Sequence, residues 1–229
     1  INQDYARIRG LEVAVTRRVG NSLNATLSGA YQIATGKSNT AAESALQIRQ
    51  QGFVNTTTEQ FLAWDRPFDL KFFMAYTPDS TQYIGKFPLK GFRVSLSSTF
   101  KSGLRYTPQQ LINVNQETGR PEYEPILDQP FAKVGAPWFW ANLRVSRDIF
   151  LGQRGRRITF SFELENITNF KSAAVVNPVT GRGYELGDPT PLTWRDPNFP
   201  DPQDRGLPPT NPARFLTPRH MWFGIEVGL

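Results

Sequence analysis

Hydrophobic and polar residues alternate along seven stretches of the chain. In the fourth stretch, for example, Phe92, Val94 and Leu96 alternate with arginine and serine residues. Because successive side chains of a β-strand point to opposite faces, this period of two predicts strands with one apolar and one polar face. No segment of comparable length shows a 3.6-residue period, so the sequence predicts an all-β chain. The seven predicted strands are Tyr5–Val19, Leu23–Thr35, Pro67–Thr77, Gly91–Lys101, Trp138–Ile149, Arg157–Asn169 and Arg219–Leu229.

The links between the predicted strands alternate between short and long. The short links are 20–22, 78–90 and 150–156, and the long links are 36–66, 102–137 and 170–218. If consecutive strands pair in antiparallel fashion, all the long links lie at one end of the sheet. Outer-membrane β-barrels have short periplasmic turns and long extracellular loops, and each of their strands needs ~9–11 residues to cross the membrane. The pattern predicts an antiparallel transmembrane β-barrel segment whose three long links are extracellular loops.

The odd number of strands indicates that residues 1–229 form only part of a barrel. With the short turns in the periplasm, Leu229 would end at the periplasmic rim and Ile1 would enter from the extracellular side. A complete bacterial barrel normally has an even number of strands and both termini in the periplasm. We therefore expect the chain to be the C-terminal part of a larger barrel, and any targeting signal to have been removed or to lie upstream. The remaining strands would belong to the same chain or to a separate one.

Composition removes several kinds of chemistry. The 229 residues include no cysteine and a single histidine, His220. A disulfide framework, a thiolate zinc site and a thiol nucleophile are excluded, and a His-centred triad is disfavoured. Glu163 and Glu165 lie two residues apart on one strand face, but no histidine or third ligand accompanies them. We expect no enzymatic activity, no catalytic or metal-binding residue and no cofactor.

The charged residues fall into two groups, in a chain with a net charge of +6. One group occupies the polar faces of the predicted strands. A Lys or Arg side chain that faced hydrocarbon at the bilayer midplane would cost ~2–4 kcal/mol, so we expect these side chains to point into a water-filled lumen or against a plug. A basic group at the short turns indicates a solvated rim or lipid headgroups rather than nucleic acid, since stacking aromatics are not interleaved with it. The first group is Arg93, Lys101, Arg144, Glu163 and Glu165; the second is Arg17, Arg18, Arg154, Arg156 and Arg157.

Three further features lie near strand ends or in the last link. Aromatic residues at strand ends predict either an interfacial girdle or ordinary packing in a sandwich core; they are Trp64, Trp138, Phe139 and Trp140. The segment Gly181–Gly187 resembles a dinucleotide loop, but its third glycine is one residue late and no helix is predicted after it. Ten prolines between Pro178 and Pro218 predict an ordered lid or partner-binding surface, or only a long external loop.

Short motifs at these strands and loops resemble those of one family. The motifs are Arg9-Gly10-Leu11-Glu12, Asp65-Arg66-Pro67, Lys101-Ser102-Gly103-Leu104-Arg105-Tyr106-Thr107-Pro108, Asn142-Leu143-Arg144-Val145-Ser146, Glu163-Leu164-Glu165-Asn166-Ile167-Thr168-Asn169 and Pro218-Arg219. Their order and spacing are similar to the C-terminal third of TonB-dependent outer-membrane receptors, of the large type with an N-terminal carboxypeptidase-regulatory-like extension. The resemblance implies a 22-stranded barrel, closed around a plug and energised through a TonB box. The family usually ends in an aromatic residue, whereas this chain ends in Leu229.

The resemblance implies that the chain supplies barrel wall, three extracellular loops and the closing strand of a receptor that imports a scarce nutrient across the cell outer membrane of a Gram-negative bacterium. Its expected partners are outer-membrane lipid and lipopolysaccharide, the TonB system through a region outside these residues, and a surface lipoprotein or other subunit. One alternative is a structural or adhesive barrel component that binds a partner protein or surface polymer. Another is a soluble carbohydrate-binding β-sandwich, which requires Phe92, Val94 and Leu96 to be buried against a second sheet. The transported substrate is not predicted, because fold alone does not determine it.

Overall fold

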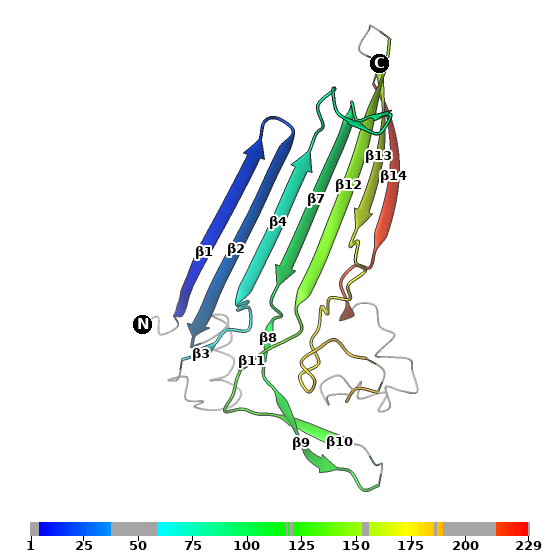
Figure 1. Cartoon of the computed structure of the whole chain (residues 1–229). Coiled ribbons are helices and arrows are strands. Elements are labelled where there is room, and N and C mark those ends of the chain that lie inside the picture. Colours follow the sequence, from blue (N-terminus) through cyan, green and yellow to red (C-terminus); the bar gives the residue numbers. More distant parts are fainter. Residues whose placement is uncertain are drawn as a thin grey trace.

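One antiparallel sheet of seven long strands dominates the computed structural model, which describes residues 5–37, 59–117, 119, 121–152, 156–185, 187–189 and 214–228. The long strands are β1 (Ala6–Val19), β2 (Leu23–Gly36), β4 (Phe68–Tyr76), β7 (Phe92–Lys101), β12 (Trp138–Leu151), β13 (Arg156–Glu165) and β14 (His220–Gly228). Each pairs with the next in chain order, as Figure 1 shows. All seven predicted strands are thus confirmed.

The largest boundary difference is in β13, which was predicted to reach Asn169 but ends at Glu165. Asn166 has a positive φ of 49° and Asn169 a positive φ of 53°. An L-residue in this left-handed region turns the backbone out of the extended ladder, and asparagine is one of the few residues that adopt it readily. In the sequence, the alternation of polar and apolar residues continues beyond Glu165, where the backbone leaves the sheet, and this made the predicted strand too long.

Two of the predicted links contain small hairpins that alternation did not reveal. In the link after β4, β5 (Tyr83–Ile84) pairs with β6 (Phe87–Pro88). In the link after β7, β9 (Gln109–Val114) pairs with β10 (Pro121–Pro125). Shorter pairings join β3 (Gln60–Phe61) to β2 and β8 (Arg105–Tyr106) to β11 (Lys133–Val134). Strands of two residues are too short to show a period of two.

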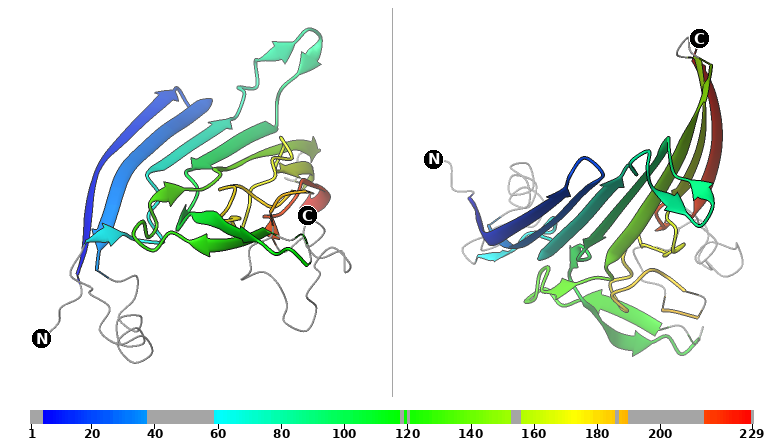
Figure 2. Two further views of the ribbon diagram at one scale, coloured as in Figure 1. Left: turned by 90° about the horizontal axis from the view of Figure 1, so that it is seen from below. Right: turned by 45° about the horizontal axis from the view of Figure 1, so that its top comes forward.

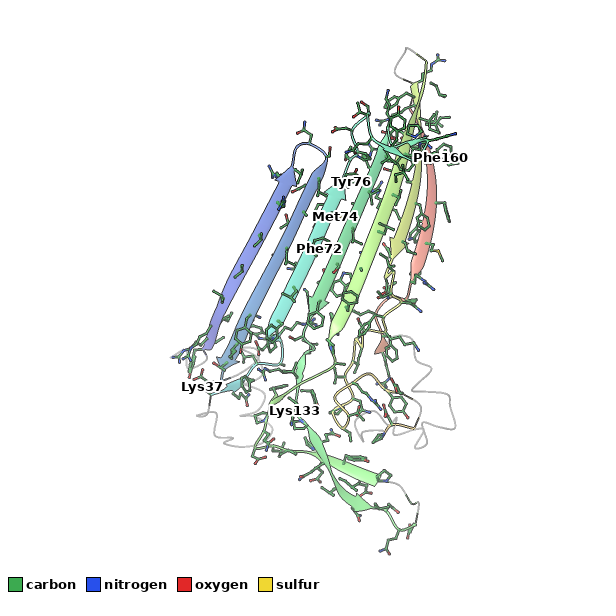
Figure 3. The ribbon with its side chains drawn as sticks, viewed as in Figure 1. Lys37, Phe72, Met74, Tyr76, Lys133 and Phe160 are labelled. Carbon is green, nitrogen blue, oxygen red and sulfur yellow. The ribbon has the colours of Figure 1, made fainter. Side chains whose placement is uncertain are left out.

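The register of the main sheet brings the apolar residues of every strand to one face. Leu96 of β7 pairs with Met74 of β4 and with Leu143 of β12, which pairs in turn with Leu164 of β13. Directly paired residues of antiparallel strands lie on the same side of the sheet. Phe72, Met74 and Tyr76 are labelled along β4 in Figure 3 and belong to this face. A shift of one residue in any strand would reverse its two faces.

The sheet is curved, and its polar face is concave. Seen from below in Figure 2, the strands form an arc, and the segment that follows β13 lies inside the arc. This segment contacts the polar face, since the indole Nε1 of Trp138 donates a hydrogen bond of 2.7 Å to the carbonyl of Ala173. The β1–β2 turn and the β5–β6 hairpin lie at one end, and the described parts of the three long links lie at the other, as predicted (Figure 1).

The convex apolar face is exposed. Phe223 is 82% exposed, Ile225 71% and Leu11 67%. Phe92, Val94 and Leu96 are only half-buried, so the sandwich expectation is wrong for these residues. Phe92 contacts Phe87 of the β5–β6 hairpin, and no larger second sheet is present in the described part of the chain. In the same residues the sheet does not close on itself, because β1 and β14 each pair on one side only. None of the described segments is a helix long and apolar enough to cross a membrane.

Candidate functional site

The concave face carries pairs of opposite charge, both within and between strands. Arg144 of β12 lies 3.1 Å from Glu163 of β13, and their positions pair directly in the register. Asp69 of β4 lies 3.3 Å from Lys71 and 3.5 Å from Lys101 of β7. These side chains are partly exposed, so each pair contributes little to stability. The pairs leave a hydrophilic surface in which few charges are unbalanced.

A second cluster lies toward the short-turn end of the same face. The guanidinium of Arg93 lies 3.0 Å from a carboxylate oxygen of Asp148, and the hydroxyl of Thr159 donates to the same oxygen at 2.8 Å. Asp148 and Thr159 are buried, because the flanking strands enclose their side chains. Arg93 and Arg144, two of the charges predicted for polar strand faces, therefore lie on the concave face, together with Lys101, Glu163 and Glu165.

At the long-link end, a buried ion pair fastens two links to the sheet. Asp65 is fully buried, and its carboxylate accepts hydrogen bonds from the backbone of Ala34 in β2 at 2.9 Å and from Nε of Arg105 at 2.6 Å. The guanidinium of Arg105 also lies 3.6 Å from the centre of the Phe61 ring. Asp65 and Arg105 come from two of the motifs that carry the family resemblance. No periodic signal in the sequence joins them, so sequence reasoning missed the pair.

Next to this ion pair, the hydroxyl of Ser102 joins β7 to β4. It accepts a hydrogen bond of 2.7 Å from the backbone of Phe68, and the backbone of Ser102 donates to the carbonyl of Phe68 at 2.8 Å. The adjacent Gly103 has no room for a side chain, because a Cβ there would overlap the carbonyl oxygens of Gly135 and Ala136. Ser102 and Gly103, in the motif that leaves β7, therefore fix the path of the backbone.

Asparagine side chains fasten the segment after β13. The Asn166 side chain is buried; its Nδ2 donates to the carbonyls of Phe170 and Thr217, both at 3.2 Å. Its backbone donates to Oδ1 of Asn142 at 3.0 Å. In the same way, Oδ1 of Asn169 accepts from the backbone of Arg219 at 3.1 Å. Three of the motifs quoted above thus meet at the long-link end of β12, β13 and β14.

A hollow of about 430 Å³ opens on the concave face between β1, β2 and β4. Its floor is formed partly by small side chains, including Ala14, Ser28 and Ala30. Trp64 and Arg66 line it from the link before β4, and the charged residues Glu12, Asp69 and Lys71 line it from the strands. The hollow therefore combines an aromatic ring with acidic, basic and neutral polar groups, which suits a polar ligand with some apolar surface.

Arg66 is held beside this hollow by stacking. Its guanidinium carbon lies 3.7 Å from the centre of the Trp138 ring, and one of its terminal nitrogens is buried without a hydrogen-bond partner. Burial lowers the pKa of the Arg66 guanidinium from its ordinary value, and the nearby charge of Asp69 opposes this effect. Cation–π stacking compensates part of the desolvation cost of the charge. Arg66 and Lys71 are the two cations that line the hollow.

The predicted aromatic girdle does not hold for Trp138 and Trp140. They pair in register with Lys101 and Thr99, so both lie on the concave polar face. Trp64 lines the hollow on the same side. Of the four residues, Phe139 lies on the apolar face, where its ring contacts Phe170 with a centroid distance of 6.1 Å. A position at a strand end does not determine the face, because odd and even positions along a strand point to opposite sides.

The apolar face nevertheless carries aromatic residues at both ends. Tyr31 and Phe68 form a pair with ring centroids 5.0 Å apart at the long-link end, in addition to Phe139 and Phe170. The short-turn end has Tyr76, Phe87, Phe92 and Phe160. Between the two groups, most residues of this face are aliphatic, and the exceptions include Phe72, Phe162 and Phe223. The sequence could have predicted these two aromatic groups, if each aromatic residue had been assigned to a face from its odd or even position in the alternating pattern.

Several other predicted features fall on links and turns. Gly181 has a positive φ of 77° and lies against the Tyr106 ring, in a turn where Arg182 lies 2.9 Å from Asp188. The predicted basic group lies at the short-turn ends of β1 and β13, except Arg154, which is outside the described residues. Residues 38–58 of the first long link and 190–213 of the proline-rich segment also lie outside the described residues.

The described residues provide no obvious chemistry for catalysis. Glu163 is paired with Arg144, and Glu165 pairs in register with His220, whose ring stacks on Trp222. No group of three or more His, Cys, Asp or Glu side chains in this part of the chain is arranged to hold a metal ion. The absence of an enzymatic role stays a prediction.

Comparisons with known proteins give no further guidance. No family model, no curated protein and no solved structure matches the chain. The function is therefore argued from the fold and from the two faces of the sheet.

Proposed function

We propose that the chain forms part of the wall of a transmembrane β-barrel in the cell outer membrane, as the C-terminal portion of a TonB-dependent receptor that imports a scarce nutrient. The observation that carries this proposal is the apolar convex face, which extends over all seven strands and is left exposed. Monomeric soluble proteins rarely expose a contiguous apolar patch of more than a few hundred Å². Lipid is the solvent that such a face requires.

The distribution of aromatic residues supports a membrane-facing role. Phe68 and Tyr76 mark the two ends of the apolar face of β4, a strand of nine residues. They are separated by roughly 26 Å along the strand, at ~3.3 Å per residue, which is about 20 Å along the membrane normal for a strand tilted by ~40°. The apolar band of outer-membrane barrels is ~25 Å tall and is flanked by aromatic girdles. The two aromatic groups of the convex face would lie at the two membrane interfaces.

The concave face and the open edges support a barrel larger than this sheet. Paired charges such as Arg144 and Glu163 suit a wet lumen and are costly in hydrocarbon. The edges of β1 and β14 present unpaired backbone groups, which require partners inside a bilayer. Further strands would satisfy both edges. The hollow beside Arg66 would then face the lumen at the extracellular end, where an incoming nutrient first enters.

Cysteine accessibility tests this topology, because the chain itself has no cysteine. Lys133, labelled in Figure 3, is exposed at the long-link end, and Lys86 is exposed at the turn of the β5–β6 hairpin. A membrane-impermeant maleimide applied to intact cells is expected to label Lys133→Cys and to leave Lys86→Cys unlabelled until the outer membrane is permeabilised. Labelling of both variants on intact cells, or recovery of the protein in the soluble fraction, would overturn the proposal.

A structural or adhesive role is the second candidate, and the β9–β10 hairpin favours it. Leu111, Ile112 and Val114 are each about half exposed on this hairpin, which extends away from the sheet at the long-link end (Figure 1). Exposed apolar residues in a loop suit a protein partner. The polypeptide isolated from native outer membrane distinguishes the two roles. A plug domain and a TonB box upstream in that polypeptide support import, and a mass near 25.9 kDa supports a separate structural subunit.

A further inference from the structure

The charged residues that the main strands place on the convex face are all arginines near strand ends. They are Arg7, Arg9, Arg17, Arg147 and Arg156. Every carboxylate of these strands lies on the concave face. The arginines at the long-link end have an acidic neighbour in Glu59, whose pKa is lowered by a hydrogen bond from Thr35 and by the charges of Arg7 and Arg9. Those at the short-turn end, Arg17, Arg147 and Arg156, have no ion-pair partner among the described residues.

Arg147 is the most enclosed of these three. It pairs in register with Phe92 of β7 and with Phe160 of β13. Its guanidinium carbon lies 4.6 Å from the ring centre of Phe87 and 4.9 Å from that of Phe92. Its Nε is buried and has no hydrogen-bond partner. A guanidinium among aromatic rings, with a buried donor unsatisfied and no carboxylate of the described residues within 4.0 Å, lacks the anion that would offset its desolvation.

A groove of about 320 Å³ begins at Arg147 and runs along the apolar face. Its walls come from β7, β12, β13 and β14 and include Phe160, Phe162, Phe223 and Ile225. Val145 and Phe162 pair directly, one position closer to the middle of this face than Arg147 and Phe160. The groove therefore extends from a cation near the strand ends toward the centre of the apolar band. A hydrocarbon chain is the ligand that such apolar walls accept.

We propose that Arg147 and this groove form a binding site for one anionic phospholipid, with the lipid phosphate on the guanidinium and an acyl chain along Phe162 and Phe223. The site rests on the proposed function, because it requires the convex face to lie in a bilayer. A planar guanidinium matches two phosphate oxygens. Phe87, Phe92 and Phe160 place that contact at the aromatic level of the short-turn end, where headgroups lie. Arg17 and Arg156 add positive potential at the same end.

Native mass spectrometry of the full-length protein, released from nanodiscs, tests the site. The nanodiscs contain phosphatidylglycerol and phosphatidylcholine with the same acyl chains. The protein is expected to retain phosphatidylglycerol about tenfold better than phosphatidylcholine, since charge-assisted hydrogen bonds supply this preference. Arg147→Gln is expected to reduce the retention of phosphatidylglycerol to the phosphatidylcholine level. Arg144→Gln, three residues away on the concave face, is the matched control and is expected to leave retention unchanged.

A second pair of variants guards against a folding defect in Arg147→Gln. Phe223 is 82% exposed and its neighbour Trp222 is 58% exposed on the opposite face, so both tolerate truncation. Phe223→Ala is expected to weaken the retention of both lipids, because it removes a groove wall, and Trp222→Ala to weaken neither. Unchanged retention in Arg147→Gln and Phe223→Ala would overturn the site, as would displacement of the lipid by equimolar inorganic phosphate. Failure of the unmodified protein to float with vesicles would instead overturn the membrane proposal itself.

Discussion

The Asp65–Arg105 ion pair leads to a residue-scale prediction. Asp65 is fully buried and Arg105 is nearly so, with 2.6 Å between the carboxylate and Nε. Asp65→Asn keeps the acceptor for the Ala34 backbone but leaves Arg105 as an uncompensated buried charge. Breaking a buried pair in this way is expected to lower the free energy of unfolding by about 3–5 kcal/mol. Urea titration of the full-length protein in detergent measures this loss.

The matched control for Asp65→Asn is Asp69→Asn. Asp69 also contacts cations, at 3.3 and 3.5 Å, but its side chain is 27% exposed and Lys71 is 59% exposed. Water screens such pairs, so the expected loss is below about 1 kcal/mol. Equal effects of the two substitutions would contradict the structural role assigned to the Asp65–Arg105 pair.

Asn166 gives a second prediction at the scale of residues. Its backbone adopts a positive φ, and its side chain separately donates two hydrogen bonds. Both Asn166→Gly and Asn166→Ala remove the hydrogen bonds to Phe170 and Thr217. Only alanine also forces a β-carbon into the left-handed region at φ 49°. Asn166→Ala is therefore expected to be less stable than Asn166→Gly by about 1–2 kcal/mol in the same urea titration. The opposite order would show that the positive φ is not what selects this residue.

At the scale of elements, the path of the link that leaves β7 depends on Gly103. Only a glycine lets the backbone at this position pass so close to the backbone of Gly135 and Ala136. Gly103→Ala would place a Cβ against the carbonyl oxygens of Gly135 and Ala136, and backbone cannot move aside as a side chain can. The substitution is expected to cost at least about 2 kcal/mol, as overpacking does. It should also expose the β8–β11 pairing to added protease, since that pairing lies next to the contact.

Gly29→Ala is the control for Gly103→Ala. A Cβ at Gly29 would meet only the Cδ2 atom of Leu70, at 2.8 Å, and that side chain is half-exposed and free to rotate. Replacing glycine by alanine also stabilises a strand slightly, because it lowers the conformational entropy of the unfolded chain. The expected change in unfolding free energy is within about 1 kcal/mol of zero. Similar losses at both glycines would contradict the distinction between backbone and side-chain obstruction.

The elements differ in how far the sequence predicted them. The seven long strands were predicted because each alternates over nine or more residues. The β5–β6 and β9–β10 hairpins were not, since short strands within links show no period. The faces of Trp138 and Trp140 were also missed, although the parity of Phe139 and Ala141 in the same strand contains that information. Arg147 could have been found in the same way, as a charge at an apolar-face position of an alternating strand.

At the scale of the whole molecule, the two faces of the sheet are predicted to tolerate charge differently. Met74, labelled in Figure 3, lies on the convex face of β4, between Phe72 at the middle of the strand and Tyr76 at its short-turn end. Ala75 is its neighbour on the concave face. In vesicles, Met74→Lys is expected to lower the unfolding free energy by about 1–2 kcal/mol, between the cost of a lysine at the bilayer midplane and its cost near the interface. Ala75→Lys is expected to change it by less than about 1 kcal/mol, because it faces water.

Urea titration of Met74→Lys and Ala75→Lys, in lipid vesicles and in water, distinguishes contact with lipid from ordinary packing. A face that contacts water would accept lysine at position 74 without loss. Equal tolerance of Met74→Lys and Ala75→Lys would therefore remove the main support for the membrane proposal. A loss confined to position 74 would support it.

The sequence by itself determined the seven long strands, their two faces and the lengths of the links, because alternation and link length are local properties of the chain. The order of the strands in the sheet was assumed and then found in the structure. Only the tertiary structure decided the curvature of the sheet and which residues meet at its long-link end. Asp65 and Arg105 are 40 residues apart in the chain, and Asn142 and Asn166 are 24 apart. Such contacts depend on how links fold back over the strands, and no local pattern specifies that path. The hollow beside Arg66 and the groove beside Arg147 arise in the same way, from side chains that separate strands bring together.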